Sequence, residues 1–129
     1  MKSIFLFLTV LLVIGTHHGS AQRGGKAEPN RINFAAGTSS KTLTGRLRNG
    51  QEMEYVFGAS KGQIVTIKNA GWRIFDFRVF SEENFPEGDF DSSPTYSFEI
   101  PESGDYMLFV RKKVAGPSSA RFSITLSIR

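Results

Sequence analysis

Apolar and polar residues alternate one for one along much of this chain, and this period of two constrains the fold more than any other feature. Near the C-terminal end, one face carries Phe122, Ile124, Leu126 and Ile128, and the other carries only hydroxyl and arginine side chains. Such alternation is typical of an antiparallel strand with one buried face. Helical spacing is rare after residue 21, so we expect an all-β protein.

The same alternation recurs in segments that are separated by turn-forming residues. Asn49-Gly50 supplies the residues that a tight hairpin turn needs. Residues 81–94 form a long loop with aromatic and acidic side chains. About eight strands at this spacing predict an antiparallel β-sandwich. The expected strands lie near residues 32–34, 42–48, 53–59, 64–68, 72–80, 96–100, 106–110 and 121–129.

The first 21 residues have the composition of a secretory signal peptide. Lys2 gives a positive start, residues 4–14 are an apolar run too short to span a bilayer, and Ala21 ends a small-residue cleavage site. We therefore expect a signal peptide at 1–21, a flexible segment at 22–30 and one β-sandwich domain at 31–129. The expected location of the protein is therefore the periplasm or the extracellular medium. No cysteine lies near the cleavage site for a lipid anchor, and no second apolar segment predicts membrane insertion of the mature chain.

Catalytic chemistry is restricted because the chain has no cysteine and both histidines, His17 and His18, lie in the expected leader. The mature chain then lacks Ser-His-Asp and Cys-His arrangements and the usual zinc ligands. Two carboxylates such as Asp76 and Glu99 are sufficient for glycoside hydrolysis, but a small domain with no evident deep cleft argues against it. We expect no enzyme, no cofactor and no metal, with calcium in the acidic loop 81–94 as the alternative.

Charged residues are segregated along the chain. Residues 23–78 carry ten basic and four acidic residues, residues 79–110 carry eight acidic and no basic residues, and residues 111–129 carry five basic and no acidic residues. Solvated loops alone produce such segregation. The alternative is a surface with opposed patches that steer the protein onto a charged macromolecule. Nucleic acid is not expected, because secretion separates the chain from it and no basic helix or aromatic RNA-binding motif is present.

Five short pieces of the sequence carry a family resemblance. They are Gly-Thr-Ser-Ser at 37–40, Gly45, Tyr-Val-Phe-Gly-Ala at 55–59, Lys-Gly-Gln-Ile-Val at 61–65 and Gly-Asp-Tyr-Met-Leu at 104–108. In this order and spacing they resemble the periplasmic inhibitors of goose-type (g-type) lysozyme. Some are also similar to the broader class of pre-peptidase C-terminal domains. The resemblance implies a β-sandwich and a bacterial, non-catalytic protein whose partner is a lysozyme.

A lysozyme cleft contains catalytic carboxyl groups and binds a polysaccharide, so a loop with cations and hydroxyls is suited to filling it. The alternative function is a glycan-binding or adhesion module, which uses exposed aromatic residues. The candidate partner-binding residues are therefore cations, hydroxyls and one tryptophan: Arg111, Lys112, Lys113, Ser118, Ser119, Ser92, Ser93, Trp72 and Arg73.

Each candidate also has an ordinary structural interpretation. The cations at 111–113 are also expected if they protect an edge strand against pairing with other chains. Exposed charges of this kind contribute little to folding. Ser92 and Ser93 are also typical of turns, and Trp72 at the start of a strand is also expected to be partly buried.

Overall fold

The computed structural model describes residues 30–86 and 88–129, which form eight strands and no helix. The all-β class and the predicted number of strands are confirmed. The expected signal peptide lies outside the described residues, as does the expected flexible segment except for Asn30, which lies in the first strand. The strands are β1 (Asn30–Arg31), β2 (Ser40–Arg48), β3 (Glu52–Ala59), β4 (Ile64–Asn69), β5 (Phe75–Phe80), β6 (Thr95–Glu99), β7 (Gly104–Lys112) and β8 (Ser119–Ile128).

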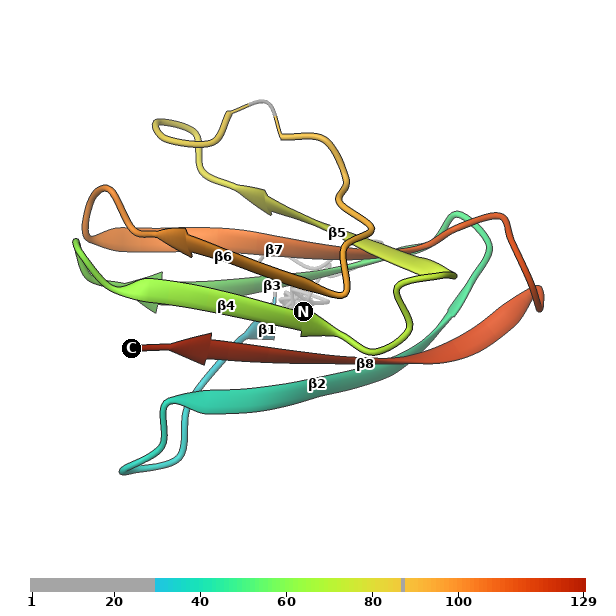
Figure 1. The fold of residues 1–129 in the computed structure, drawn as a ribbon, viewed down its shortest axis with the longest axis horizontal. Coiled ribbons are helices and arrows are strands. Elements are labelled where there is room, and N and C mark those ends of the chain that lie inside the picture. The colour runs from blue at the N-terminus through green and yellow to red at the C-terminus, as the bar shows by residue number, and fades with distance from the viewer. Residues whose placement is uncertain (1–29, 87) are drawn as a thin grey trace, which may run out of the picture.

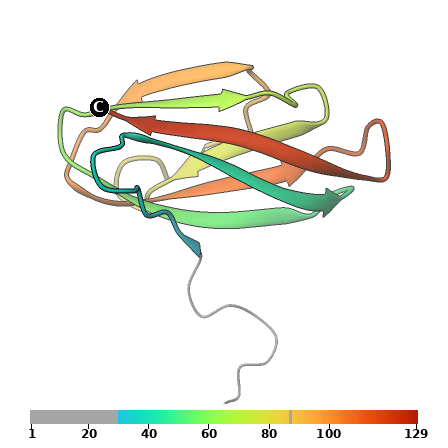
Figure 2. The same cartoon turned by 90° about the horizontal axis from the view of Figure 1, so that it is seen from below.

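Successive strands alternate between two stacked sheets (Figure 1). The odd-numbered strands form one sheet in the order β1-β3-β7-β5, and the even-numbered strands form the other in the order β2-β8-β4-β6. We call them the odd sheet and the even sheet. Strands pair antiparallel throughout, except that β1 is parallel to β3. Figure 2 shows the two layers from below. Every connection between the described strands therefore crosses from one sheet to the other.

This topology corrects the prediction of a hairpin at Asn49-Gly50. The turn itself forms, with a φ of 80° at Gly50 and a hydrogen bond of 3.0 Å from Gln51 N to Arg48 O. However, β2 pairs with β8 and β3 pairs with β7. Turn residues favour a reversal of the chain, but they do not determine which partner the next strand takes.

The first strand is also displaced from its predicted position. We expected it near Ile32 and Phe34, and it is β1, at Asn30–Arg31. Ile32 still belongs to the core with 5% of its surface exposed, and its amide donates to Val56 O at 2.8 Å. The chain thus continues along β3 for one residue before it turns away.

The strand predicted from residue 72 begins three residues later, at Phe75. Gly71 O accepts hydrogen bonds from Ile74 N at 3.0 Å and from Phe75 N at 2.9 Å. These bonds close a turn over residues 71–74, so Trp72 lies in a loop and not in a strand. The loop position leaves its side chain exposed.

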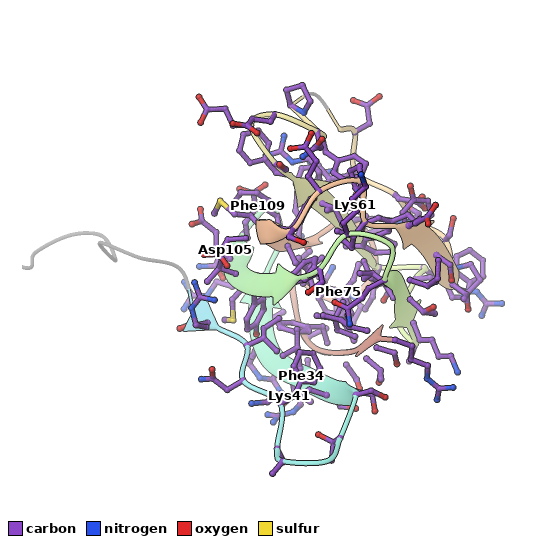
Figure 3. The ribbon with its side chains drawn as sticks, turned by 90° about the vertical axis from the view of Figure 1, so that its left-hand side faces the viewer. Phe34, Lys41, Lys61, Phe75, Asp105 and Phe109 are labelled. Carbon is purple, nitrogen blue, oxygen red and sulfur yellow. The ribbon has the colours of Figure 1, made fainter. Side chains whose placement is uncertain are left out.

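Aromatic residues from both sheets fill the core. Phe75 lies between the sheets in Figure 3 and meets Phe122 edge-on, with ring centroids 5.9 Å apart. Phe57 stacks on Tyr106 at 5.8 Å within the odd sheet. The predicted buried row of β8 is confirmed, because its members are at most 8% exposed: Phe122, Ile124, Leu126 and Ile128.

The predicted long loop 81–94 connects β5 to β6 and covers the open side of the sandwich. The backbone of Asp91 exchanges two hydrogen bonds with Phe77, at 3.0 and 2.7 Å, and so caps the free edge of β5. Phe85 packs edge-on against Phe98 at 5.4 Å. This bridge blocks the middle of the edge of β5 against pairing with another chain. In the described residues there is no helix of the length and apolar character that a membrane span requires.

Candidate functional site

Three loops gather at one end of the sandwich, on the right-hand side of Figure 1. They are residues 49–51, between β2 and β3; residues 70–74, between β4 and β5; and residues 113–118, between β7 and β8. These loops contain Arg73 and Lys113 and no acidic residue. We call the three loops together the basic end.

Backbone hydrogen bonds hold the loops of the basic end together. Asn49 N donates to Ser118 O at 3.0 Å, which joins the first loop to the third. Lys113 N donates to Ile74 O at 2.9 Å, which joins the second loop to the third. The arrangement is therefore one connected surface built from three sequence-distant segments.

Lys112 anchors this surface from inside. It is fully buried, and its ammonium group donates to Asn49 Oδ1 at 3.0 Å, to Lys113 O at 2.8 Å and to Ala115 O at 2.5 Å. A buried ammonium requires such acceptors, because an unpaired charge in the interior is costly. Lys112 was a candidate for contact with a partner. Its burial gives it a different role, which is to position loops 49–51 and 113–118.

Lys113 lies on the surface of the basic end. Its ammonium group donates to Trp72 O at 3.0 Å, so the side chain reaches across to loop 70–74. Trp72 is 39% exposed, and the guanidinium carbon of Arg73 lies 5.2 Å from the centre of its ring. Val114, which sequence reasoning missed, is 81% exposed. The basic end thus presents cations together with exposed apolar surface.

Arg111 points away from the basic end, onto the outer face of the odd sheet. It forms a two-point ion pair with Asp76, with Nε to Oδ1 at 3.1 Å and Nη2 to Oδ2 at 2.7 Å. This hydrogen bonding raises the pKa of Arg111 above its ordinary value. The ring of Phe90, from loop 81–94, covers the guanidinium at 3.7 Å. The expectation that this cation contributes little to folding is therefore wrong, because its partner Asp76 is buried.

The alternative interpretation of residues 111–113, as protection of an edge strand, is also wrong. β7 lies between β3 and β5 in the odd sheet, and Arg111 is paired on both sides, with Glu52 of β3 and Asp76 of β5. Arg111 and Lys112 end this central strand, and only Lys113 belongs to the loop. The three cations therefore have three separate environments.

The candidate serines differ in their surroundings. Ser118 is exposed in loop 113–118, whereas Ser119 begins β8 and accepts a long hydrogen bond of 3.4 Å from Arg46 Nη1. Ser92 and Ser93 are half-buried, and Ser93 N donates to Asp91 Oδ1 at 2.6 Å. This is an ordinary Asx turn. The pair still lies close to the basic end, because the neighbouring Pro94 accepts a hydrogen bond from Asn69 N at 2.9 Å.

The opposite end of the sandwich is acidic on one side. Glu82, Glu83, Glu102 and Asp105 line a shallow pocket of about 240 Å³ where β7 begins. Asp105 pairs with Arg31 at 2.7 Å, and this hydrogen bond lowers the pKa of Asp105 below its ordinary value. Charge segregated along the sequence is thus also separated in space, with cations at the basic end and carboxylates at the start of β7.

The two carboxylates considered for hydrolysis do not meet. Asp76 lies in the odd sheet and is bound to Arg111, whereas Glu99 lies in the even sheet and is exposed. Among residues 30–86 and 88–129 there is no group of three or more acidic, cysteine or histidine side chains that could hold a metal ion. Glu87, from the acidic loop, lies outside the described residues.

No family model matches the sequence, and no curated protein is similar to it in sequence. Solved structures are similar. The periplasmic inhibitor of g-type lysozyme from Aeromonas hydrophila, PliG, is 25% identical, with a TM-score of 0.65 over 78% of this chain and 96% of that chain. PliG from Salmonella Typhimurium is 20% identical, with a TM-score of 0.66 over 81% of this chain and 100% of that chain.

The pre-peptidase C-terminal domain of a Bacillus anthracis collagenase shares the fold with a lower TM-score. It is 19% identical, with a TM-score of 0.53 over 83% of this chain and 100% of that chain. The two resemblances read from the sequence are therefore confirmed in structure. The expectation of a non-enzyme agrees with these findings, since the structures with the higher TM-scores are of lysozyme inhibitors.

Proposed function

We propose that this protein is an exported inhibitor of a lysozyme, most specifically of the g-type, and that the basic end enters the active-site cleft. The proposal is supported by the likeness to PliG from Aeromonas hydrophila, which extends over 96% of that chain. It also draws on the expected signal peptide at 1–21 and on the periplasmic location of the similar inhibitors.

The observation that carries the proposal is the composition of the basic end. Trp72 and Val114 are exposed beside Arg73 and Lys113, on loops that hydrogen bonds and the buried Lys112 hold together. Rigid loops lose little conformational entropy on binding. Tryptophan, tyrosine and arginine are enriched among the few residues that supply most of the binding energy in protein interfaces. Cations complement the carboxyl groups of a lysozyme cleft.

The first test is a cell-wall lysis assay with g-type, chicken-type and invertebrate-type lysozymes. We expect inhibition of the g-type enzyme in particular. Failure to inhibit any of the three would overturn the inhibitor proposal and favour the glycan-binding module.

The second test locates the site. Arg73→Glu combined with Lys113→Glu should weaken inhibition by at least tenfold, because both charges face the proposed cleft. The matched control is Lys41→Glu combined with Lys61→Glu, which reverses two charges at the other end of the sandwich (Figure 3). An equal loss in both variants would show that overall charge, and not the basic end, determines inhibition.

A further inference from the structure

The outer face of the even sheet is covered by hydroxyl groups and cations. In β8 the outward positions alternate with the buried row, and the same holds in β2 from Thr42 and in β4. In β6 the pairing with β4 places Thr95, Ser97 and Glu99 on this outer face. The hydroxyls form cross-strand pairs, Thr42 with Thr125 and Thr66 with Ser97, each at 2.9 Å. The outward cations are Arg46, Arg48, Lys68, Arg121 and, directly after β8, Arg129.

These cations have no carboxylate partners in the described part of the chain. The two ion pairs found there, Arg31 with Asp105 and Arg111 with Asp76, both belong to the odd sheet. Glu99, at the edge strand β6, is the single acidic side chain on the outer face of the even strands, all of which are described. The face therefore has an uncompensated positive charge.

Two of its arginines stand directly opposite each other. Arg46 in β2 is the register partner of Arg121 in β8. Like charges at opposed positions destabilise a sheet. The guanidinium groups have only long hydrogen bonds to neutral hydroxyls, from Arg46 to Ser119 Oγ at 3.4 Å and from Arg121 to Thr44 Oγ1 at 3.3 Å. An anion bound between them would relieve the repulsion and gain two strong donors.

A second position for an anion lies farther along the same face. Ile64, Thr66, Lys68, Ser127 and Arg129 line a shallow groove of about 280 Å³, with hydroxyls on its floor and a cation on either side. The β8 residues that lead to it from Arg121 present hydroxyls outward. At about 3.4 Å per residue, the eight steps of β8 from Arg121 to Arg129 span roughly 27 Å. This length suits a polymer with repeated anionic groups better than a small ion.

We propose that the outer face of the even sheet binds an acidic polysaccharide, with one carboxylate or sulfate group between Arg46 and Arg121 and another in the groove beside Lys68 and Arg129. The sugar hydroxyls match the rows of threonine and serine between these positions. A membrane surface fits less well, because Ile64 is the only exposed large apolar residue on this face. A single-stranded nucleic acid fits less well, because the aromatic residues of the even strands lie at inward register positions, with Tyr96 opposite the buried Ile67 and Phe98 opposite the buried Val65, while Phe122 is itself buried.

The test measures binding of the mature protein to dextran sulfate and to polygalacturonate, with neutral dextran as the reference polymer. We expect binding to at least one acidic polymer, weakened by salt, and none to dextran. The two acidic polymers distinguish sulfate from carboxylate as the recognised group. Arg46→Gln combined with Arg121→Gln should weaken binding at least tenfold.

The matched control, Lys41→Gln combined with Lys61→Gln, removes the same charge elsewhere and should stay within twofold of the unmutated protein. Figure 3 labels both lysines. Thermal unfolding provides a second readout, since loss of the opposed arginines should leave the unfolding temperature unchanged or higher. No binding to either acidic polymer, equal losses in the two double variants, or equal binding to duplex DNA or to anionic vesicles would overturn the proposal. This face shares no residue with the three loops of the basic end, so the result does not depend on lysozyme inhibition.

Discussion

The buried ammonium group of Lys112 lies 3.0 Å from Asn49 Oδ1, so a single charge at the end of β7 fixes the loop between β2 and β3. Lys112→Met keeps an unbranched side chain, shorter by the nitrogen atom, and so removes the donor. The carbonyl and amide oxygens around it then lose their partner, at a cost of about 1–3 kcal/mol in the free energy of unfolding. Urea denaturation measures this loss, and we expect inhibition of lysozyme to weaken in parallel because the loops are released.

Lys113→Met is the control for that experiment. The Lys113 ammonium is near the surface and bonds a single carbonyl group, so the free energy of unfolding should change by no more than about 0.5 kcal/mol. Equal stability of the Lys112 variant and the unmutated protein would contradict the anchoring role of Lys112.

The ion pair between Arg111 and Asp76 makes a second prediction. Arg111→Gln leaves the Asp76 carboxylate buried without its cation, which destabilises by about 3–5 kcal/mol for fully buried pairs. Arg111 is 37% exposed, so we expect a smaller loss of about 2–3 kcal/mol. Chemical denaturation measures it. The double variant Arg111→Gln with Asp76→Asn should recover part of the loss, and failure to recover any would show that the charge of Asp76 is not its cause.

Gly45 in β2 predicts a packing effect. A Cβ atom at this position would lie 2.8 Å from Cε1 of Phe122, whose ring covers the glycine. Gly45→Ala should therefore destabilise by about 1–3 kcal/mol, measured in urea. Gly58→Ala is the control, because its Cβ would meet Asp105 Oδ1 at an ordinary 3.4 Å. An equal loss in both variants would mean that strand glycine itself, and not the Phe122 ring, determines the effect.

From the ion pair between Asp105 and Arg31 we predict a small, pH-dependent contribution to the free energy of unfolding. The pKa of Asp105 is lowered in the folded protein, so its stabilisation is present above the ordinary pKa of an aspartate and is lost as the pH falls through the lowered value. Both side chains are exposed, so Asp105→Asn should cost about 0.5 kcal/mol or less at pH 7. Thermal unfolding should show this difference at pH 7 and none in strong acid. A difference that grows toward low pH would contradict the assignment.

The alternation of apolar and polar residues predicted most of the strands, because each strand with one buried face carries that alternation in its own sequence. The burial of the row from Phe122 to Ile128 in β8 could be predicted without knowing which strands lie beside β8. The pairing of strands was not predictable in the same way. The turn at Gly50 has the glycine that a reversal requires, but the partner of β2 is β8, far along the chain. Which strands pair depends on how all eight share one core.

The sequence predicted where the candidate site lies better than it predicted the role of each residue there. The alternation of Tyr106, Leu108 and Val110 extends to Lys112 and places its side chain inside, so a signal for its burial was present in the sequence. The ion-pair partner of Arg111 could not be predicted from the sequence, because Asp76 belongs to β5, and only the fold places β5 beside β7. Val114 carries no pattern that distinguishes it from any other loop residue.

The alternation of strands between the sheets also determines how the chain can fold. None of the eight described strands pairs with the strand that follows it in the sequence, so these strands form no hairpin that could fold early. Even β1 and β3, which pair with each other, are separated in the sequence by β2. Proteins dominated by such distant contacts fold in milliseconds to seconds, far more slowly than those with local ones. β8 occupies the interior of the even sheet between β2 and β4. The even sheet therefore cannot be completed until β8, the last strand that the structure describes, has been inserted between its two neighbours.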